Sequence, residues 1–544
     1  MKSIVNTFLL IFLAYSSISS QPFTRQDTLR GSITPERAWW DLAYYDLAID
    51  FDISNKFLRG TNTIHFNVIA PHSIMQIDLQ EPLKITNVDY RGKSLTFKRE
   101  GNVYWIAFAQ PLEQGVSDRI TISYEGIPVE AVRPPWDGGL TWSKDAHQKP
   151  FVATSCQGLG ASVWWPCKDH MYDEADSMFI RITAPSELMD VSNGRLRHID
   201  YHSNGKRTWH WFVSNPINSY GVNANIADYA HWSDTIHGEN GVLDLDFYVL
   251  QDHFDTAQTH FTDVHKTIRA FEHWLGPYPF YEDGFKLVEV PYLGMEHQSS
   301  VTYGNKFRKG YLGRDLSGTG WGLKWDFIIV HETAHEWWAN SITYKDIADM
   351  WIHESFANYA ESLFLDYHYG RQAANEYVIG TRLNIANDKP IIGPYHVNKK
   401  GSGDMYYKGG NMLHTIRMWI NDDAKWRSIL RGLQKEFYHQ TVTSKQIEDY
   451  ISKEMGKDLT PFFNQYLRDT RIPVVEFIRK GKTLKYRYTN TVDGFNLPLL
   501  ASIDNGDNTW ISPTSTWQTI KRKSAVASFT VDPNSYVNIK DSSK

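Results

Sequence analysis

The most informative stretch of this 544-residue chain is His331-Glu332-Thr333-Ala334-His335, which is followed by Glu354. Residues four positions apart share one face of a helix, so His331 and His335 can direct two imidazole nitrogens at one point. A carboxylate from a following helix, Glu354, would complete the three-ligand shell of a catalytic zinc and leave one position open for water. The spacing therefore predicts metal-assisted hydrolysis with one Zn²⁺ per chain.

Glu332 lies beside the two histidines and is not needed as a ligand. It is therefore the candidate general base, which takes a proton from the attacking water. The metzincin variant of this motif requires Gly and His at positions that Trp338 and Ser341 occupy here, so that class is excluded. The alternative interpretation is an amphipathic helix whose two histidines are solvated or hydrogen-bonded at the margin of a core.

Two helices are expected around this motif. An apolar run from Trp325 to Val330 leads into it, as in a helix that is buried on most sides. The second helix is expected from Asp349, as its N-cap, to Gly370. Glu361 lies seven residues after Glu354 on the same face. We expect it to be a solvated helix charge, with a role beside the zinc ligands as the alternative.

The rest of the chain changes its periodicity twice. Apolar residues alternate from about residue 44 to residue 69, which predicts two strands separated by a turn at Arg59-Gly60. Helical spacing begins near Thr256 and dominates through Leu467, apart from a strand-like run at 285–290. After Pro473 the pattern returns to strands. We therefore predict an α+β multidomain fold, with the following division: a signal peptide (1–20), an N-terminal β domain (21–230), a mainly helical catalytic domain (231–472) and a small C-terminal β-sandwich (473–544).

The composition of the chain limits which binding partners and which location are expected. The formal charge of −6 is modest and no long Lys/Arg cluster occurs, so nucleic acid is not expected as a partner. Lys2, an apolar stretch from Phe8 to Ala14 and small residues before Gln21 predict a signal peptide, with an uncleaved membrane anchor as the alternative. No later segment is long and apolar enough to span a membrane. We expect an exported protein, periplasmic or secreted.

With Glu354 in Trp351-Ile352-His353-Glu354-Ser355-Phe356-Ala357, the chain resembles the M1 family of zinc aminopeptidases, which includes aminopeptidase N and leukotriene A4 hydrolase. The resemblance implies a saddle-like N-terminal β domain and a thermolysin-like catalytic domain. It also implies a short form that lacks the C-terminal helical domain of the large members. Peptides with a free N-terminus are then the expected substrates.

Three further segments carry this resemblance. Leu293-Gly294-Met295-Glu296-His297 is similar to the family's GxMEN loop, which implies that Glu296 binds the substrate α-amine beside Gly294 and Met295. Leu293 and His297 depart from that pattern. Tyr406-Tyr407-Lys408-Gly409 is similar to the YEKG segment, which implies that Tyr406 donates to the oxyanion, with Tyr407 as the alternative. The loop after Cys156 resembles one whose Gln reaches the substrate amine or its first carbonyl, so Gln157 is a substrate-binding candidate.

The sequence thus predicts a zinc aminopeptidase with Glu332 as general base. A leukotriene A4 hydrolase-like epoxide hydrolase, a thermolysin-like endopeptidase and a non-catalytic peptide-binding protein on a peptidase scaffold are the alternatives. Cys156 and Cys167 could pair in an oxidising compartment. Both fall in a segment of the family where pairing is not required, so we expect free, buried thiols.

Overall fold

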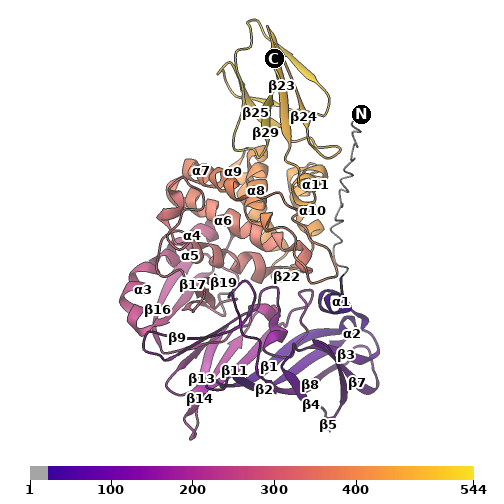
Figure 1. Ribbon diagram of the computed structural model, residues 1–544, viewed down its shortest axis with the longest axis vertical. Coiled ribbons are helices and arrows are strands. Elements are labelled where there is room, and N and C mark those ends of the chain that lie inside the picture. Colours follow the sequence, from indigo (N-terminus) through magenta and orange to yellow (C-terminus); the bar gives the residue numbers. More distant parts are fainter. Residues whose placement is uncertain (1–22, 544) are drawn as a thin grey trace, which may run out of the picture.

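The computed structural model describes residues 23–543 and has three parts along its long axis (Figure 1). A β-rich part forms the base, a mainly helical part lies in the middle, and a small β part with the C-terminus lies at the top. This arrangement confirms the predicted α+β multidomain fold class. The predicted signal peptide, residues 1–20, lies outside the described residues.

The base is built on a large, mostly antiparallel sheet. Strand β1 pairs antiparallel with β2 and parallel with β11, and alternate side chains such as Leu47, Ile49 and Phe51 are buried. In spatial order, its eight strands are β13 (Arg195–Tyr201), β14 (Lys206–Val213), β11 (Ser177–Pro185), β1 (Trp40–Asp52), β2 (Phe57–Val68), β8 (Ser117–Gly126), β4 (Lys84–Tyr90) and β5 (Lys93–Ser94).

The turn between the first two strands is not at Arg59-Gly60, and that prediction is wrong. The chain turns at residues 53–56, whereas Arg59 and Gly60 pair with Asp50 and Ile49 inside the ladder. A Cβ atom at Gly60 would lie 2.5 Å from the carbonyl oxygen of Ala48. Glycine is therefore needed here for close packing of neighbouring strands and not for a turn.

Two smaller sheets and two short helices complete the base. The first sheet contains β3 (His72–Asp78), β7 (Val103–Leu112) and β6 (Thr96–Glu100), and the second contains β12 (Met189–Val191), β15 (Asn225–Ala227), β10 (Pro150–Ser155) and β9 (Gly139–Lys144). The helices are α1 (Arg25–Gly31) and α2 (Pro35–Ala38). Buried Arg37 in α2 donates to both carboxylate oxygens of Asp78 at 2.7 Å. Asp78 also accepts from the backbone N–H of Asp169, which fixes the segment that follows β10.

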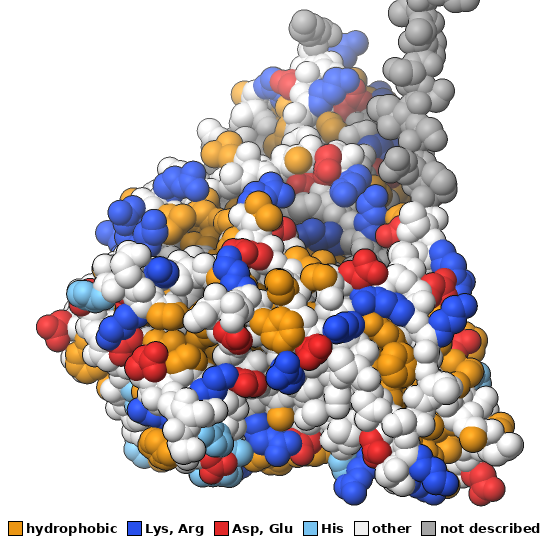
Figure 2. Space-filling view, turned by 60° about the horizontal axis from the view of Figure 1, so that its bottom comes forward, with side chains coloured by type: hydrophobic (Ala, Val, Ile, Leu, Met, Phe, Trp, Pro, Cys, Tyr) orange, Lys and Arg blue, Asp and Glu red, His pale blue; other side chains and the backbone are white. Residues whose placement is uncertain are grey.

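Figure 2 shows this base from below, with Lys and Arg side chains interspersed with Asp and Glu over the visible face. Charges of both signs thus alternate there, without one extended basic area on that face. Within residues 23–543, no helix combines the length and apolar character needed to cross a lipid bilayer.

The middle part packs helices on a five-stranded sheet. Its strands are β16 (Tyr229–Gly238), β17 (Gly241–Leu250), β18 (Phe285–Glu289), β20 (Val301–Tyr303) and β19 (Gly294–Met295), and a parallel pair, β21 (Ile342–Tyr344) and β22 (Gln440–Val442), lies apart. Its helices are α3 (Phe254–His260), α4 (Thr262–Leu275), α5 (Phe327–Ala334), α6 (Trp351–Tyr369), α7 (Arg371–Gly380), α8 (Tyr407–Ile420), α9 (Asp423–Glu436), α10 (Ser444–Met455) and α11 (Thr460–Leu467). The predicted helix from Thr256 is thus split in two at Phe261.

Helix α6 runs from Trp351 to Tyr369 with Gly370 as its C-cap, so its end agrees with the prediction, but its N-cap is Met350 and not Asp349. The carboxylate of Asp349 instead accepts from the backbone N–H and hydroxyl of Ser444 and from the phenol of Tyr395. Those donors come from distant segments, so the capping prediction failed because tertiary partners competed for the same carboxylate.

The top part is a small two-sheet structure. One sheet contains β27 (Gln518–Lys521), β24 (Thr483–Thr489), β23 (Val474–Lys480) and β29 (Asn538–Asp541), and the other contains β26 (Thr509–Ile511), β25 (Leu499–Ile503) and β28 (Phe529–Val531). The rings of Phe477 in β23 and Phe529 in β28 lie 4.9 Å apart, so the inner faces of the two sheets share one apolar core.

Candidate active site

Helices α5 and α6 bring together the three side chains predicted to hold a metal. His331 lies in α5, His335 caps its C-terminal end, and Glu354 lies in the first turn of α6. The Oε2 atom of Glu354 is 3.5 Å from Nε2 of His331 and 3.5 Å from Nε2 of His335. One ligand atom from each residue therefore faces a common point.

The other nitrogen of each histidine is hydrogen-bonded, and this fixes the ring. Nδ1 of His331 lies 2.8 Å from a carboxylate oxygen of Glu361, and Nδ1 of His335 lies 2.9 Å from the carbonyl oxygen of Trp338. The ring of Phe327 stacks on His331 with centroids 5.1 Å apart. Both Nε2 lone pairs are thereby directed at the common point, as in metal centres whose ligands are oriented by outer partners.

The expectation that Glu361 is a solvated charge is wrong. Its side chain is fully buried, and it accepts from Tyr377 at 2.6 Å and from Asn358 at 3.1 Å in addition to contacting His331. The reason is the helix geometry: Glu361 shares a face with Glu354, and that face of α6 packs against α5. The alternative interpretation, a partner of a metal ligand, fits this arrangement.

We expect Glu361→Gln to weaken metal binding by about 10- to 100-fold, because the amide is a poorer acceptor for the Nδ1–H of His331 than a carboxylate. Competition with a calibrated chelator would measure the metal affinity. The matched control is Glu454→Gln on the exposed surface of α10, which should leave the affinity unchanged. Equal affinities of the two variants would contradict the role of Glu361.

The residues themselves fit a zinc ion. Glu354 is only 2% exposed, and its Oε2 atom has no hydrogen-bond partner within residues 23–543. A buried carboxylate oxygen without a donor is costly, and a cation at the common point would satisfy it. Two imidazoles and one carboxylate form a donor set typical of catalytic zinc.

Glu332, the candidate general base, lies in the same cavity but outside this ligand set. Burial raises the pKa of Glu332 to about 7. A Cβ atom at Gly294 would lie 3.4 Å from the side chain of Glu332 and 2.6 Å from that of Ile328. Glycine at 294 therefore allows strand β19 to lie directly against α5, which brings the following Glu296 into the cavity.

The cavity has a volume of about 740 Å³. All of the sequence-predicted site residues line it, namely His331, Glu332, His335, Glu354, Gln157, Gly294, Met295, Glu296 and Tyr406. Tyr407, the alternative oxyanion donor, lines it as well. Side chains from the base and from the helical part therefore line the same cavity.

Glu296 is buried and held by two donors from the base of the molecule. Gln157 donates to Oε1 of Glu296 and also to Oε1 of Glu354 at 3.1 Å, and the phenol of Tyr220 donates to the same Glu296 oxygen at 3.1 Å. Burial raises the pKa of Glu296. The site therefore contains an acidic group that accepts two hydrogen bonds and lies next to the predicted metal ligands. Sequence reasoning missed Tyr220, for which no local pattern exists.

Tyr406 is the residue immediately before helix α8, and its ring centroid lies 6.1 Å from that of His331. Burial, with the nearby carboxylate of Glu354, raises the pKa of Tyr406 well above its ordinary value. The phenol is therefore protonated at neutral pH and available as a hydrogen-bond donor.

The departures from the GxMEN pattern have different surroundings. Leu293 lines the cavity, whereas His297 does not and instead lies buried with Nδ1 3.2 Å from the hydroxyl of Thr302. Burial lowers the pKa of His297 to about 3, so its ring is neutral.

Cys156 and Cys167 are free and buried, as expected.

Two family models match this chain. The description "Peptidase M1 N-terminal domain" matches residues 42–220, and "Peptidase family M1 domain" matches residues 261–466, which contain the three ligands and Glu332. The chain belongs to peptidase family M1. The resemblance inferred from the motifs is thereby confirmed.

Relatives within the family are distant in sequence. Aminopeptidase N of Lactobacillus helveticus is 24% identical over 473 residues, which cover 81% of this chain and 52% of that protein. Aminopeptidase N of Lactococcus lactis is 27% identical over 461 residues, which cover 79% of this chain and 51% of that protein. The chain spans about half the length of these relatives. The crystal structure of an M1 zinc metallopeptidase from Deinococcus radiodurans matches with a TM-score of 0.66 at 18% identity, covering 80% of this chain and 95% of that chain.

Proposed function

We propose that this protein is a zinc-dependent aminopeptidase that removes the first residue from peptides with a free N-terminus. One observation carries the proposal: the buried carboxylate of Glu296 shares a cavity with the metal ligands and Glu332. Such an anionic group fixes a substrate ammonium, so that only the first peptide bond reaches the hydrolytic centre. The relatives named aminopeptidase N, and a Deinococcus radiodurans family member whose structure was solved with a Tyr-Ser-Ala substrate, support it.

In this proposal His331, His335 and Glu354 hold the zinc. When bound, zinc supplies Lewis-acid polarisation and a lowered pKa for water. Glu332 takes the proton from the attacking water and passes it to the departing amine. A carboxylate with a pKa of about 7 is well matched to both transfers near neutral pH, because it can exist in either protonation state.

The amine anchor is assembled before the substrate arrives. Gln157 and Tyr220 hold the carboxylate of Glu296 in one position, and the side-chain amide of Asn340 donates to the Glu296 backbone carbonyl at 3.0 Å. An ammonium group that binds there meets an oriented acceptor, which reduces the entropy cost of positioning the scissile bond.

Hydrolysis of aminoacyl-anilides, compared with their N-acetylated counterparts, tests the proposal. We expect cleavage of the free-amine substrates only, and its loss on treatment with a chelator. Glu296→Gln should reduce kcat/KM for the free-amine substrates, while Glu454→Gln should not. Cleavage of both substrate forms would indicate an endopeptidase and remove Glu296 from its role. No cleavage by a zinc-containing protein would overturn the proposal.

We propose that the hydroxyl of Tyr406 donates a hydrogen bond to the oxyanion of the tetrahedral intermediate. We expect Tyr406→Phe to lower kcat by about 10²- to 10³-fold with little change in KM, because the bond strengthens only as charge develops. Tyr407→Phe is the matched control, since Tyr407 is the next residue and lines the same cavity. A larger loss of kcat in Tyr407→Phe would assign the donor to Tyr407 instead.

We also propose that the protein is exported, on the basis of the signal-peptide pattern before Gln21. N-terminal sequencing of protein recovered from producing cells tests this. The expected first residue is Gln21, and a retained Met1 would contradict cleavage.

A further inference from the structure

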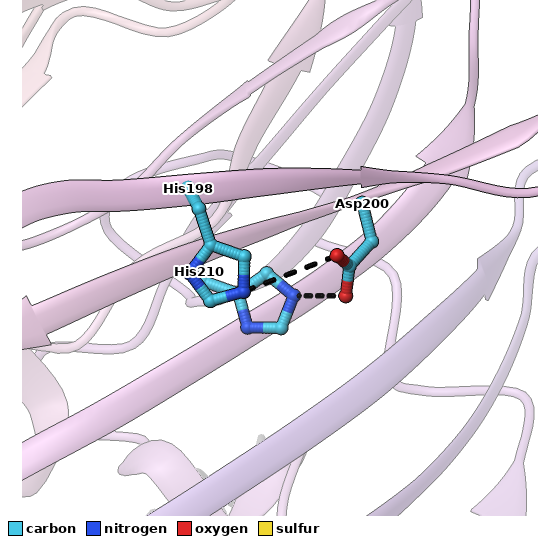
Figure 3. A group of neighbouring side chains, drawn as sticks. All are labelled: His198, Asp200 and His210. Carbon is cyan, nitrogen blue, oxygen red and sulfur yellow. Dashed lines mark hydrogen bonds and ion pairs between the residues drawn. The ribbon is translucent and has the colours of Figure 1, made fainter.

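The edge strand β13 of the large sheet and its neighbour β14 carry a second group of side chains of the types that bind metals. His198 and Asp200 lie on β13, and His210 lies on β14 (Figure 3). His198 and His210 are direct partners across the ladder, and Asp200 follows His198 by two positions, so all three project from one face of the sheet. None of them lines the cavity of the active site.

The Asp200 carboxylate faces both imidazoles. Its Oδ2 lies 2.9 Å from Nε2 of His210, and its Oδ1 lies 4.0 Å from Nε2 of His198. The two histidine rings are stacked, with centroids 3.8 Å apart and planes inclined by 17°. They overlap in the view of Figure 3. One nitrogen of each ring and a carboxylate oxygen all lie within 4.8 Å of one another.

The three side chains differ in their freedom to move. His210 is 7% exposed, and within residues 23–543 its Nδ1 has no hydrogen-bond partner. The side chains of His198 and Asp200 are each 54% exposed. A metal ion lies in the plane of each imidazole that binds it, so the stacked rings must tilt. His198 and Asp200 can rotate toward an ion at low cost, because exposed side chains change rotamer readily.

We propose that His198, Asp200 and His210 bind a divalent transition-metal ion at the edge of the N-terminal sheet, separate from the ion of the active site. Two imidazoles and one carboxylate suit Zn²⁺ or Co²⁺, whereas Mg²⁺ and Ca²⁺ prefer oxygen ligands only. Three protein ligands leave a fourth position for water or for a donor from another molecule.

The surroundings are compatible with a bound cation. The nearest cationic side chain on the neighbouring strand, Arg181, is paired with Asp46. Asp200 then remains as an acidic ligand whose charge attracts the ion.

Calorimetric titration of Zn²⁺ into protein whose active site already contains zinc tests this proposal. We expect about one additional ion per chain, and a loss of at least about 10-fold in affinity for His198→Ala and for Asp200→Asn. His237→Ala is the matched control, because His237 is an exposed histidine on another hairpin, in β16. It should bind the additional ion as the unchanged protein does.

A second measurement separates metal binding from damage to the fold. His198 and Asp200 are half-exposed, so we expect their variants to retain the circular dichroism and peptidase activity of the unchanged protein. With Co²⁺ as the probe, visible absorption bands of a nitrogen-coordinated ion should appear in the unchanged protein and be lost in His198→Ala. Absence of an additional ion, or equal binding by His198→Ala, would overturn the proposal.

Discussion

We expect Glu332→Gln to lower kcat by about 10²- to 10⁴-fold while the protein retains its metal. The amide keeps the size and burial of the side chain but cannot accept the proton of the attacking water. Zinc should remain because the three converging ligand atoms belong to His331, His335 and Glu354. A large loss of turnover with full metal content would therefore isolate the proton transfer from metal binding.

Steady-state kinetics on a free-amine anilide and zinc determination by atomic absorption would measure the two quantities side by side. Glu454→Gln provides the comparison for the same chemical change at an exposed position. Turnover close to that of the unchanged protein would show that another group accepts the proton. A parallel loss of zinc would show that Glu332 supports the metal site and would leave its role as base without support.

Removal of the metal should abolish activity and also destabilise the helical part of the protein. Glu296, Glu332 and Glu354 are three acidic side chains around one cavity, and all three are almost fully buried. Without a cation, Oε2 of Glu354 accepts no hydrogen bond from any residue in the described range 23–543, and only the imidazoles of His331 and His335 offset the repulsion among the carboxylates. Because the ion binds the folded state, free zinc at a thousand-fold excess over its Kd stabilises that state by about 4 kcal/mol.

Thermal unfolding with and without a chelator, followed by zinc addition, would measure this effect together with activity. We expect the apo protein to unfold at a lower temperature and both properties to return with zinc. Glu354→Gln provides a second arm, since it removes a ligand and one negative charge together. It should bind zinc poorly, so the addition of zinc should raise its unfolding temperature less than that of the unchanged protein. Unaltered activity after verified removal of zinc would contradict a metal-dependent reaction.

Local spacing was sufficient to predict that His331, His335 and Glu354 converge on one point, because a four-residue repeat on one helix and a carboxylate early in the next leave little geometric freedom. The same helical reasoning placed Glu361 on the correct face but could not reveal that this face is buried. The predicted turn at Arg59-Gly60 was wrong because a glycine required by close strand packing resembles a turn signal.

The surroundings of Glu296, the proposed amine anchor, show why the rest of the site was harder to derive. Glu296 is contacted by Tyr220 and Gln157, which are 76 and 139 residues away along the chain. No periodicity connects such positions, since their proximity depends on how the base docks against the helices. Gln157 was proposed only through resemblance to a family loop, and Tyr220 was not proposed at all.

The amide of Gln157 has one further consequence. It donates to Glu296 and to Glu354, so a single side chain touches both the proposed amine anchor and a proposed metal ligand. A ligand that changes the hydrogen bonding of Glu296 therefore also changes the donor available to Glu354. The two binding equilibria are thermodynamically linked: whatever factor an amine applies to the affinity for the ion, the ion must apply to the affinity for the amine.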